Sequence, residues 1–250
     1  MSRQLTILGC RLDLVDASEA VETIIALARR GNGAQIITLG TEMVVAARRD
    51  PSFLAVVNAS SLNVCDTVGL LAVARLRGAS LRERVTGVEL IDALAARSVV
   101  EKFGIYLLGG APDVASAAAA ALQARYPGLR IAGTADGYFR LEEEARVLND
   151  IRESGARIVL VGLGSPRQEF WLAQHSAELP GVVGIGIGGS FDVLSGRVAR
   201  APRAWRTLHL EWLYRLVTEP SRWRRQLALP TFVWLVIKEQ LFSRPSAKGY

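Results

Sequence analysis

The stretch RIVLVGLGSPRQEFW, residues 157–171, decides the fold of this 250-residue chain. Its first half, residues 158–163, is apolar and rich in β-branched side chains, a pattern typical of a strand that is buried on both faces. The strand breaks at Gly164, and Ser165 and Pro166 then predict an N-cap followed by proline at the first helical position. Because a helix begins where the strand ends, its polar first turn and free backbone N–H groups lie where open α/β sheets bind ligands.

The rest of the sequence repeats this alternation of strand and helix. Strands are expected at residues 5–8, 35–39, 62–65, 104–108, 130–134, 158–163 and 182–187. Helices are expected at residues 16–29, 42–49, from 51 onward, 68–76, 89–102, 112–125, 141–153 and 166–175. The alternation implies an α/β fold: a mainly parallel, Rossmann-like sheet with helices on both faces. The tail differs, since residues 196–250 are expected to be helical throughout and to form an appendage to a core of residues 1–195.

Two short patterns mark helix starts. Asp16 and Glu19 have the spacing of a capping box, in which each side chain satisfies a backbone N–H of the first turn. Asp50 followed by Pro51 indicates the end of one helix and the start of the next.

The composition excludes several classes of protein. Half of the residues are hydrophobic, enough for one substantial core. Cys10 and Cys65 are too few for a disulfide framework and fit a reducing compartment, and two histidines make a zinc site unexpected. Neither a secretory signal nor an apolar stretch long enough to span a bilayer is evident, so a cytoplasmic protein is expected.

The positive charge is concentrated in the tail. Residues 196–250 contain eleven Lys and Arg against three Asp and Glu, together with four of the five tryptophans. Cations and Trp rings are what a segment needs to bind the surface of an anionic membrane. A nucleic-acid surface would share the charge, but no recognisable nucleic-acid motif is present, so the membrane surface is the favoured partner.

Polar side chains follow two further strands. Thr38 ends residues 35–39, and Asp66 comes directly after residues 62–65. A carboxylate between an apolar strand and a helix N-terminus is well placed to act as a general base. From this pattern alone, a cap for the helix that begins near Val68 is the favoured interpretation of Asp66.

Several motifs together resemble one family. GLGSPRQEFW closely resembles a signature of the WecG/TagA/CpsF glycosyltransferases, which build bacterial surface polysaccharides. TLGTE, CDT, RVTG, GGAP, GYF, GIGGSFD and the tail motifs LEWLYRL and EPSRWRR are similar to other blocks of the family, over roughly residues 5–240. The family's usual Asn is replaced by Gly40, and its usual Pro and Gly by Cys65 and Thr67.

The resemblance implies an inverting, metal-independent transfer of a sugar from a UDP-sugar to a polyprenyl-diphosphate-linked saccharide. The absence of a D-x-D motif agrees with this, and no cofactor is expected. The implied catalytic residues are Asp66 as base, Thr38 and Arg84. The implied donor-binding residues are Gly109, Gly110, Tyr138, Gln168, Glu169 and Asp192. The implied acceptor-diphosphate clamp is Arg215, Arg222 and Arg225. The resemblance also implies a possible homo-oligomer. It further implies a cytoplasmic protein that binds peripherally to the inner face of the cell membrane.

Two interpretations from other classes remain open. The first is a nucleotide-binding α/β protein without transferase activity, such as a dehydrogenase or a sensor, although G-x-G-x-x-G does not follow the first strand. The second is a non-enzymatic membrane-surface scaffold that uses only the basic tail.

Overall fold

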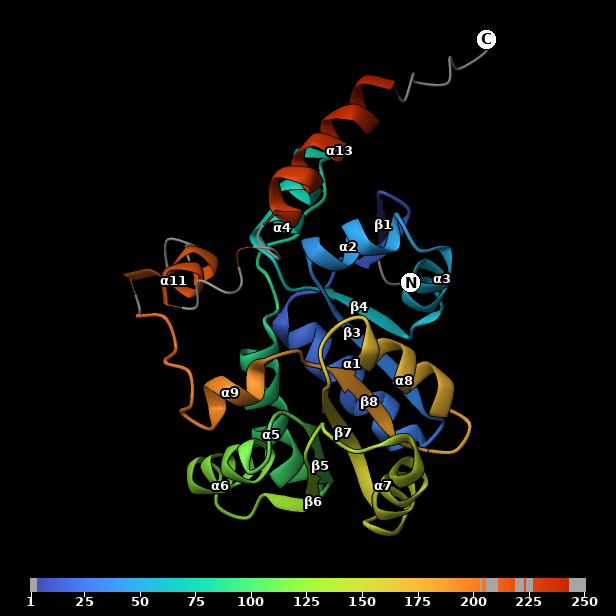
Figure 1. Cartoon of the computed structure of the whole chain (residues 1–250), viewed down its shortest axis with the longest axis vertical. Coiled ribbons are helices and arrows are strands. Elements are labelled where there is room, and N and C mark those ends of the chain that lie inside the picture. The colour runs from blue at the N-terminus through green and yellow to red at the C-terminus, as the bar shows by residue number, and fades with distance from the viewer. Residues whose placement is uncertain (1–3, 203, 206–210, 219–222, 224–226, 243–250) are drawn as a thin grey trace.

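A six-stranded parallel sheet forms the centre of the computed structural model, which describes residues 4–202, 204–205, 211–218, 223 and 227–242 (Figure 1). The strand order is β4-β3-β8-β7-β5-β6. The bounds are β3 Ala34–Leu39, β4 Leu62–Cys65, β5 Gly104–Gly109, β6 Arg130–Ala135, β7 Ala156–Gly162 and β8 Val183–Gly186. Every neighbouring pair is parallel, which confirms the predicted fold class.

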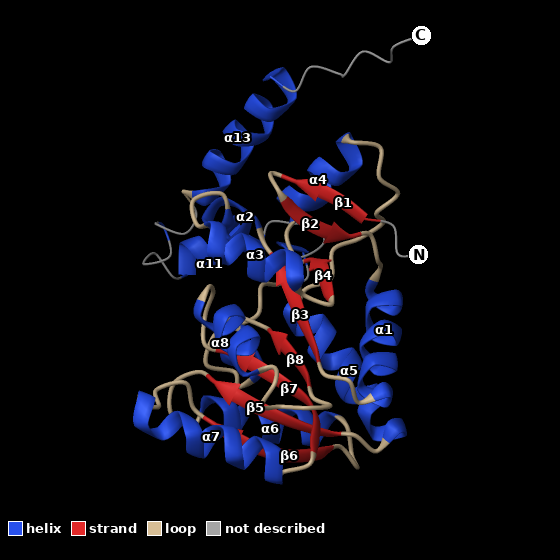
Figure 2. Cartoon of the chain, turned by 90° about the vertical axis from the view of Figure 1, so that its right-hand side faces the viewer, coloured by secondary structure: helices blue, strands red, loops and turns tan. Residues whose placement is uncertain are grey.

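Helices cover both faces of this sheet (Figure 2). One face packs against α1 Ala17–Arg30, α5 Gly87–Glu101, α6 Val114–Arg125 and α9 Ser190–Leu194. The other packs against α7 Leu141–Glu153 and α8 Arg167–His175, and, at the β3–β4 end, α2 Thr41–Ala47, α3 Pro51–Ala59 and α4 Val68–Leu76. Alternation along each strand divides the core: Ile158 and Leu160 face α1 and α5, whereas Val159 and Val161 face α7 and α8.

The first predicted strand does not join the parallel sheet. It is β1, Gln4–Ile7, and it pairs in an antiparallel hairpin with β2, Cys10–Asp13, which the sequence pattern did not predict. Leu8 and Gly9 both have positive φ, 50° and 90°, as a two-residue hairpin turn of the primed type requires. The local reason for the error is that Leu8, unlike Asn or Asp, is not a usual residue for such a turn.

The predicted helix starts are confirmed at α1 and α3 and wrong in detail at α8. Asp16 and Glu19 form the reciprocal capping box, and Asp50 caps α3 with Pro51 in its first turn. In α8, however, Pro166 is the N-cap and Arg167 the first helical residue, and Ser165 does not cap. The Gln168 N–H is satisfied instead by the carbonyl oxygen of Gly164, at 2.9 Å, so the turn needs no side-chain cap.

The prediction that the C-terminal region is helical throughout is wrong. Residues 196–202 form turns and irregular structure without a helix. The described part contains α11, Glu211–Thr218, and α13, Ala228–Phe242. The α13 helix packs on α2 and α4, where Phe232 and Val236 are buried in the core (Figure 1). No helix within the described residues is long and apolar enough to cross a membrane.

Candidate active site

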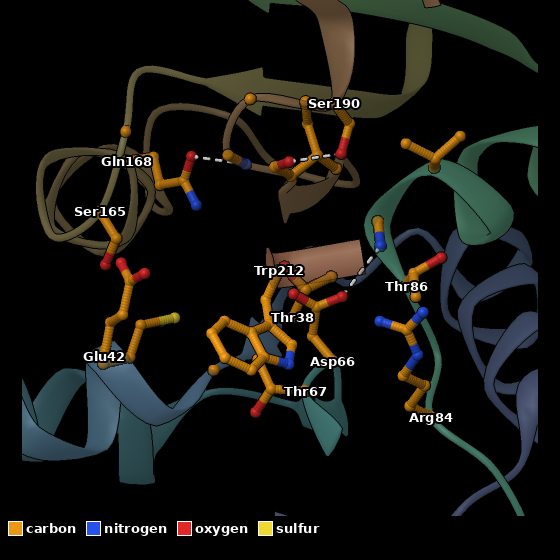
Figure 3. A pocket seen from close by; sticks show the side chains of 18 of the residues that line it. Thr38, Glu42, Asp66, Thr67, Arg84, Thr86, Ser165, Gln168, Ser190 and Trp212 are labelled. Atoms are coloured by element: carbon orange, nitrogen blue, oxygen red, sulfur yellow. Dashed lines mark hydrogen bonds between the residues drawn. The ribbon is translucent and has the colours of Figure 1, made fainter. Parts of the chain in front are cut away.

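A polar cavity of about 270 Å³ opens at the carboxyl ends of four sheet strands (Figure 3). This is the edge at which open α/β sheets bind ligands. Its walls come from the segments that follow β3, β4, β7 and β8, and from the first turn of α11. The lining includes four of the predicted catalytic and donor-binding residues of the core: Asp66, Thr38, Arg84 and Gln168.

Three helices begin at the cavity wall, and their N-termini favour the binding of anions. The α4, α5 and α8 helices, each nine or more residues long, begin beside Thr67, Thr86 and Ser165, which line the cavity. Helix N-termini present free N–H groups and the positive end of the helix dipole. The hydroxyl of Thr67 is also buried and has no hydrogen-bond partner within the described part of the chain. The cavity is therefore suited to a phosphorylated ligand.

Asp66 lies in the cavity wall, between the end of β4 and the start of α5. Its backbone N–H donates to the carbonyl oxygen of Leu39 at 3.0 Å, and its Oδ1 accepts the Gly87 N–H at 3.3 Å. The N-cap of α4 is Thr67, so the alternative interpretation of Asp66 as the cap of that helix is wrong. The carboxylate instead lies in the cavity wall beside the first turn of α5, where it can accept a proton from a bound hydroxyl.

Thr38 lies at the end of β3, next to β8. Its hydroxyl donates to the carbonyl oxygen of Gly186 at 2.8 Å, and the side chain is buried. Because this bond uses the hydroxyl proton, the oxygen faces a ligand only as an acceptor.

Arg84 is held beside Asp66 by two contacts. The neighbouring Val85 N–H donates to the carbonyl oxygen of Cys65 at 2.6 Å, which ties this segment to the end of β4. The guanidinium itself donates to Glu211 of α11, with a distance of 3.0 Å between Nη2 and Oε2. A residue of the C-terminal tail therefore fixes the position of a predicted catalytic arginine of the core.

Gln168 links the start of α8 to the loop after β8. Its Oε1 accepts the Gly188 N–H at 3.1 Å (Figure 3). Its Nε2 donates to Oε1 of Glu169 at 2.6 Å. Glu169 is buried behind Gln168 and does not line the cavity. Burial raises the pKa of the Glu169 carboxyl, and the hydrogen bonds from Gln168 and the Ser165 hydroxyl offset part of that rise. Glu169 thus orients the Gln168 amide from behind.

The remaining predicted donor-binding residues lie outside the cavity lining. Gly109 ends β5, which is separated from β3 by the two strands β8 and β7, and Gly110 follows it. The Gly110 N–H donates to the carbonyl oxygen of Gly162 at 3.1 Å. A Cβ on Gly109 would lie 2.4 Å from that same oxygen, so close approach of β5 to β7 explains the glycine. Tyr138 is 75% exposed, and Asp192 lies in α9, half-buried. Their donor-binding roles stay predictions.

The predicted acceptor clamp falls mainly outside the described residues. Arg222 and Arg225 are not among them, and Arg215 is described only as a backbone position in α11.

The cavity wall also contains residues that the sequence did not predict for the site, among them Thr67, Glu211 and Trp212. In the sequence, Thr67 stands out only as a departure from the family pattern. Glu211 and Trp212 belong to a tail motif in which the resemblance implies a role for Arg215 alone. The available signal was the pair of a carboxylate and an aromatic residue in the motif LEWLYRL. Nothing local indicates that this motif meets Arg84, 127 positions earlier.

Two further chemistries find no support among the described side chains. Cys65 precedes Asp66, but burial first and the Asp66 charge second raise its pKa to about 12, so it is a protonated thiol near neutral pH. Within the described ranges, no group of three His, Cys, Asp or Glu side chains is placed to hold a metal ion.

Comparison with known proteins identifies the family to which this chain belongs. A family model described as "Glycosyl transferase WecG/TagA/CpsF family" matches residues 5–246. A Bacillus spizizenii protein named N-acetylglucosaminyldiphosphoundecaprenol N-acetyl-beta-D-mannosaminyltransferase is 36% identical over 221 residues, which cover 88% of this chain and 84% of the relative. A protein of the same name from Bacillus subtilis is 35% identical over 208 residues, covering 83% of this chain and 80% of the relative. The chain therefore belongs to the WecG/TagA/CpsF family and is a glycosyltransferase.

Proposed function

We propose that this glycosyltransferase moves a sugar from a UDP-sugar to a polyprenyl-diphosphate-linked saccharide, with inversion at the anomeric carbon. The observation that carries the proposal is the position of Asp66, a carboxylate in the wall of a cavity at which three helix N-termini and Arg84 meet. The names of the two relatives make an N-acetylglucosaminyl-diphosphate lipid the first acceptor to test and N-acetylmannosamine the first sugar.

In the proposed reaction, Asp66 takes the proton from the acceptor hydroxyl. The hydroxyl oxygen attacks the anomeric carbon from the face opposite the UDP, so one C–O bond forms as the bond to the diphosphate breaks. Arg84 and the helix N-termini offset the negative charge that develops on the departing UDP. Thr38 accepts a hydrogen bond from a sugar hydroxyl, since its own proton is given to Gly186.

The donor is proposed to lie toward β7 and β8. The Gln168 amide, fixed between Gly188 and Glu169, would contact the donor sugar or its phosphates. Gly109, Gly110, Tyr138 and Asp192 would extend this side of the site, with the exposed Tyr138 ring free to stack on the uracil. The sequence lacks a D-x-D motif, so we propose that arginines and helix dipoles, without a metal ion, counter the diphosphate.

The tail is proposed to hold the enzyme on the inner face of the cell membrane. Residues 196–250 carry eight surplus positive charges, and α13 exposes an apolar surface that includes Trp234 (58% exposed) and Leu241 (73% exposed). The acceptor diphosphate would be held by Arg215, Arg222 and Arg225. Changing these three arginines to alanine should reduce transfer far more than liposome binding. Equal transfer by the triple variant and the parent would leave the tail with an anchoring role alone.

The direct test is a screen of UDP-sugars against N-acetylglucosaminyl-diphosphate-undecaprenol, with product detected by mass and its anomeric configuration by NMR. The expected product gains one hexosamine in the inverted configuration, with and without a chelator. A parent enzyme that transfers from no UDP-sugar, but transfers from another nucleotide sugar, would contradict the donor assignment. A retained anomeric configuration would remove Asp66 from the role of base.

A further inference from the structure

A second cavity, of about 510 Å³, adjoins the active site. The two share Glu42, Met43 and Ser165 in their walls, so they lie side by side. The second cavity runs between α2 and the first turn of α13, on the side away from the donor-binding loops after β8. This second cavity is called the acceptor groove, and its lining residues are Glu42, Met43, Val45, Ala46, Arg49, Ser165, Pro166, Leu227, Ala228 and Thr231.

One face of α2 lines this groove with an ordered set of side chains. Glu42, Val45 and Ala46 are spaced by three and four positions, which places them on the same side of α2, and Arg49 lines the groove from the turn after the helix. The side chains change from a carboxylate at the active site to apolar groups and then to a cation.

Arg49 is available to a ligand. Its side chain is exposed, and it makes no ion pair with any carboxylate of the described residues. An unpaired guanidinium in a groove that leads away from an active site is a binding group for phosphate oxygens.

The far wall of the groove leads to an apolar surface. Leu227, Ala228 and Thr231 line the groove, and the outward face of α13 begins directly after them. That face exposes four large apolar side chains at helical spacing: Val233 (48%), Trp234 (58%), Ile237 (50%) and Leu241 (73%). The opposite face, with Phe232 and Val236, is buried against the core. A chain leaving the groove therefore meets apolar surface.

We infer that the acceptor groove binds the diphosphate and the first isoprenyl units of the lipid-linked acceptor. This inference rests on the proposed function. The acceptor is a saccharide joined to a diphosphate joined to a polyprenyl chain, and the groove offers groups for these parts in the same order. Glu42 accepts hydrogen bonds from saccharide hydroxyls, Arg49 pairs with the diphosphate, and residues 227–231 of the tail contact the chain as it leaves toward the membrane. Arg49 thus adds a cation of the core to the arginines proposed in the tail.

The test compares Arg49→Ala with Arg48→Ala, an exposed neighbour that does not line the groove. Arg49→Ala should raise the KM for N-acetylglucosaminyl-diphosphate-undecaprenol about tenfold or more, the loss expected for a charged hydrogen bond, and leave the KM for the donor unchanged. Arg48→Ala should leave both unchanged.

A second pair of variants tests the path of the lipid. Thr231→Trp fills the groove, whereas Val233→Trp places the same ring on the outward face of α13. Thr231→Trp should lower transfer to the undecaprenyl acceptor about tenfold, and Val233→Trp should not. If the parent transfers sugar but either groove variant behaves like its control, the groove assignment is wrong and the proposed function stands. If the parent transfers no sugar to the lipid acceptor, both are wrong.

Discussion

Removing Glu211 should weaken catalysis through Arg84. Glu211 belongs to α11 and is the described partner of the Arg84 guanidinium, at 3.0 Å, with the side chains only 18% and 20% exposed. Because Arg84 is a long side chain with many rotamers, losing this partner lets the guanidinium leave the position at which it would meet the leaving group.

The size of the effect follows from the geometry of the pair. At 3.0 Å and an effective dielectric constant near 20, the attraction is about 5 kcal/mol before desolvation is subtracted. The net contribution of a hydrogen bond to a charged group is about 1.5–3 kcal/mol. Since about 1.4 kcal/mol corresponds to tenfold in rate, Glu211→Ala should lower kcat/KM by about 10- to 100-fold.

The assay is a double-mutant cycle on kcat/KM with Glu211→Ala, Arg84→Ala and both together. If Glu211 acts through Arg84, its removal should have almost no effect once Arg84 is alanine. Glu239→Ala is the matched control, because Glu239 pairs with Arg77 between α13 and the core, and its effect should be the same with or without Arg84. An unchanged kcat/KM for Glu211→Ala would refute the reasoning, and an increase would show that Glu211 holds Arg84 away from the substrate.

Three further outcomes are expected. Asp66→Asn should lower kcat by about 10²–10⁴-fold with UDP-sugar binding retained by calorimetry, since only the base is lost; near-normal turnover would exclude Asp66 as the base. Burial raises the pKa of Glu169 above its usual value of 4.5, so the stability that this group contributes is present below about pH 4.5 and is lost as pH rises through the folded-state pKa. The unfolding free energy of Glu169→Gln, measured in urea, should therefore increase relative to the parent with rising pH, and the opposite trend would contradict the assignment. Phe232→Ala, which removes the buried ring that joins α13 to α2 and α4, should lower the free energy of unfolding by about 3–5 kcal/mol; a loss under about 1 kcal/mol would show that α13 unfolds independently.

Most helix and strand positions follow from short-range patterns. Apolar runs bounded by turn residues predict β4 and α4 with the bounds observed, helical patterning predicts α7, and the capping box of Asp16 and Glu19 predicts the start of α1. These signals are readable because each depends on side chains within a few positions of one another. The hairpin of β1 and β2 shows the limit, since Leu8 adopts its positive φ without a sequence signal for it.

Part of the active site also follows from the sequence. Thr38 lies near the end of β3, Asp66 directly follows β4, and Gln168 is in the first turn of the helix after β7. Because the carboxyl ends of parallel strands meet at one edge, the convergence of these three residues is predictable. The same reasoning places Gly109 and Gly110 at that edge. It does not predict that the strand order puts two strands, β8 and β7, between them and β3, so that they lie outside the cavity lining.

The tertiary structure alone decided which residues of the tail complete the cavity. Glu211 meets Arg84 across 127 positions, Trp212 enters the wall beside it, and Phe232 joins α13 to α2. The motif around Glu211 predicts a helix but not its partner. The reason is physical: local propensity and capping act within one or two helical turns, whereas the docking of a distant helix is set by the apolar surface and charge that the folded core leaves uncovered.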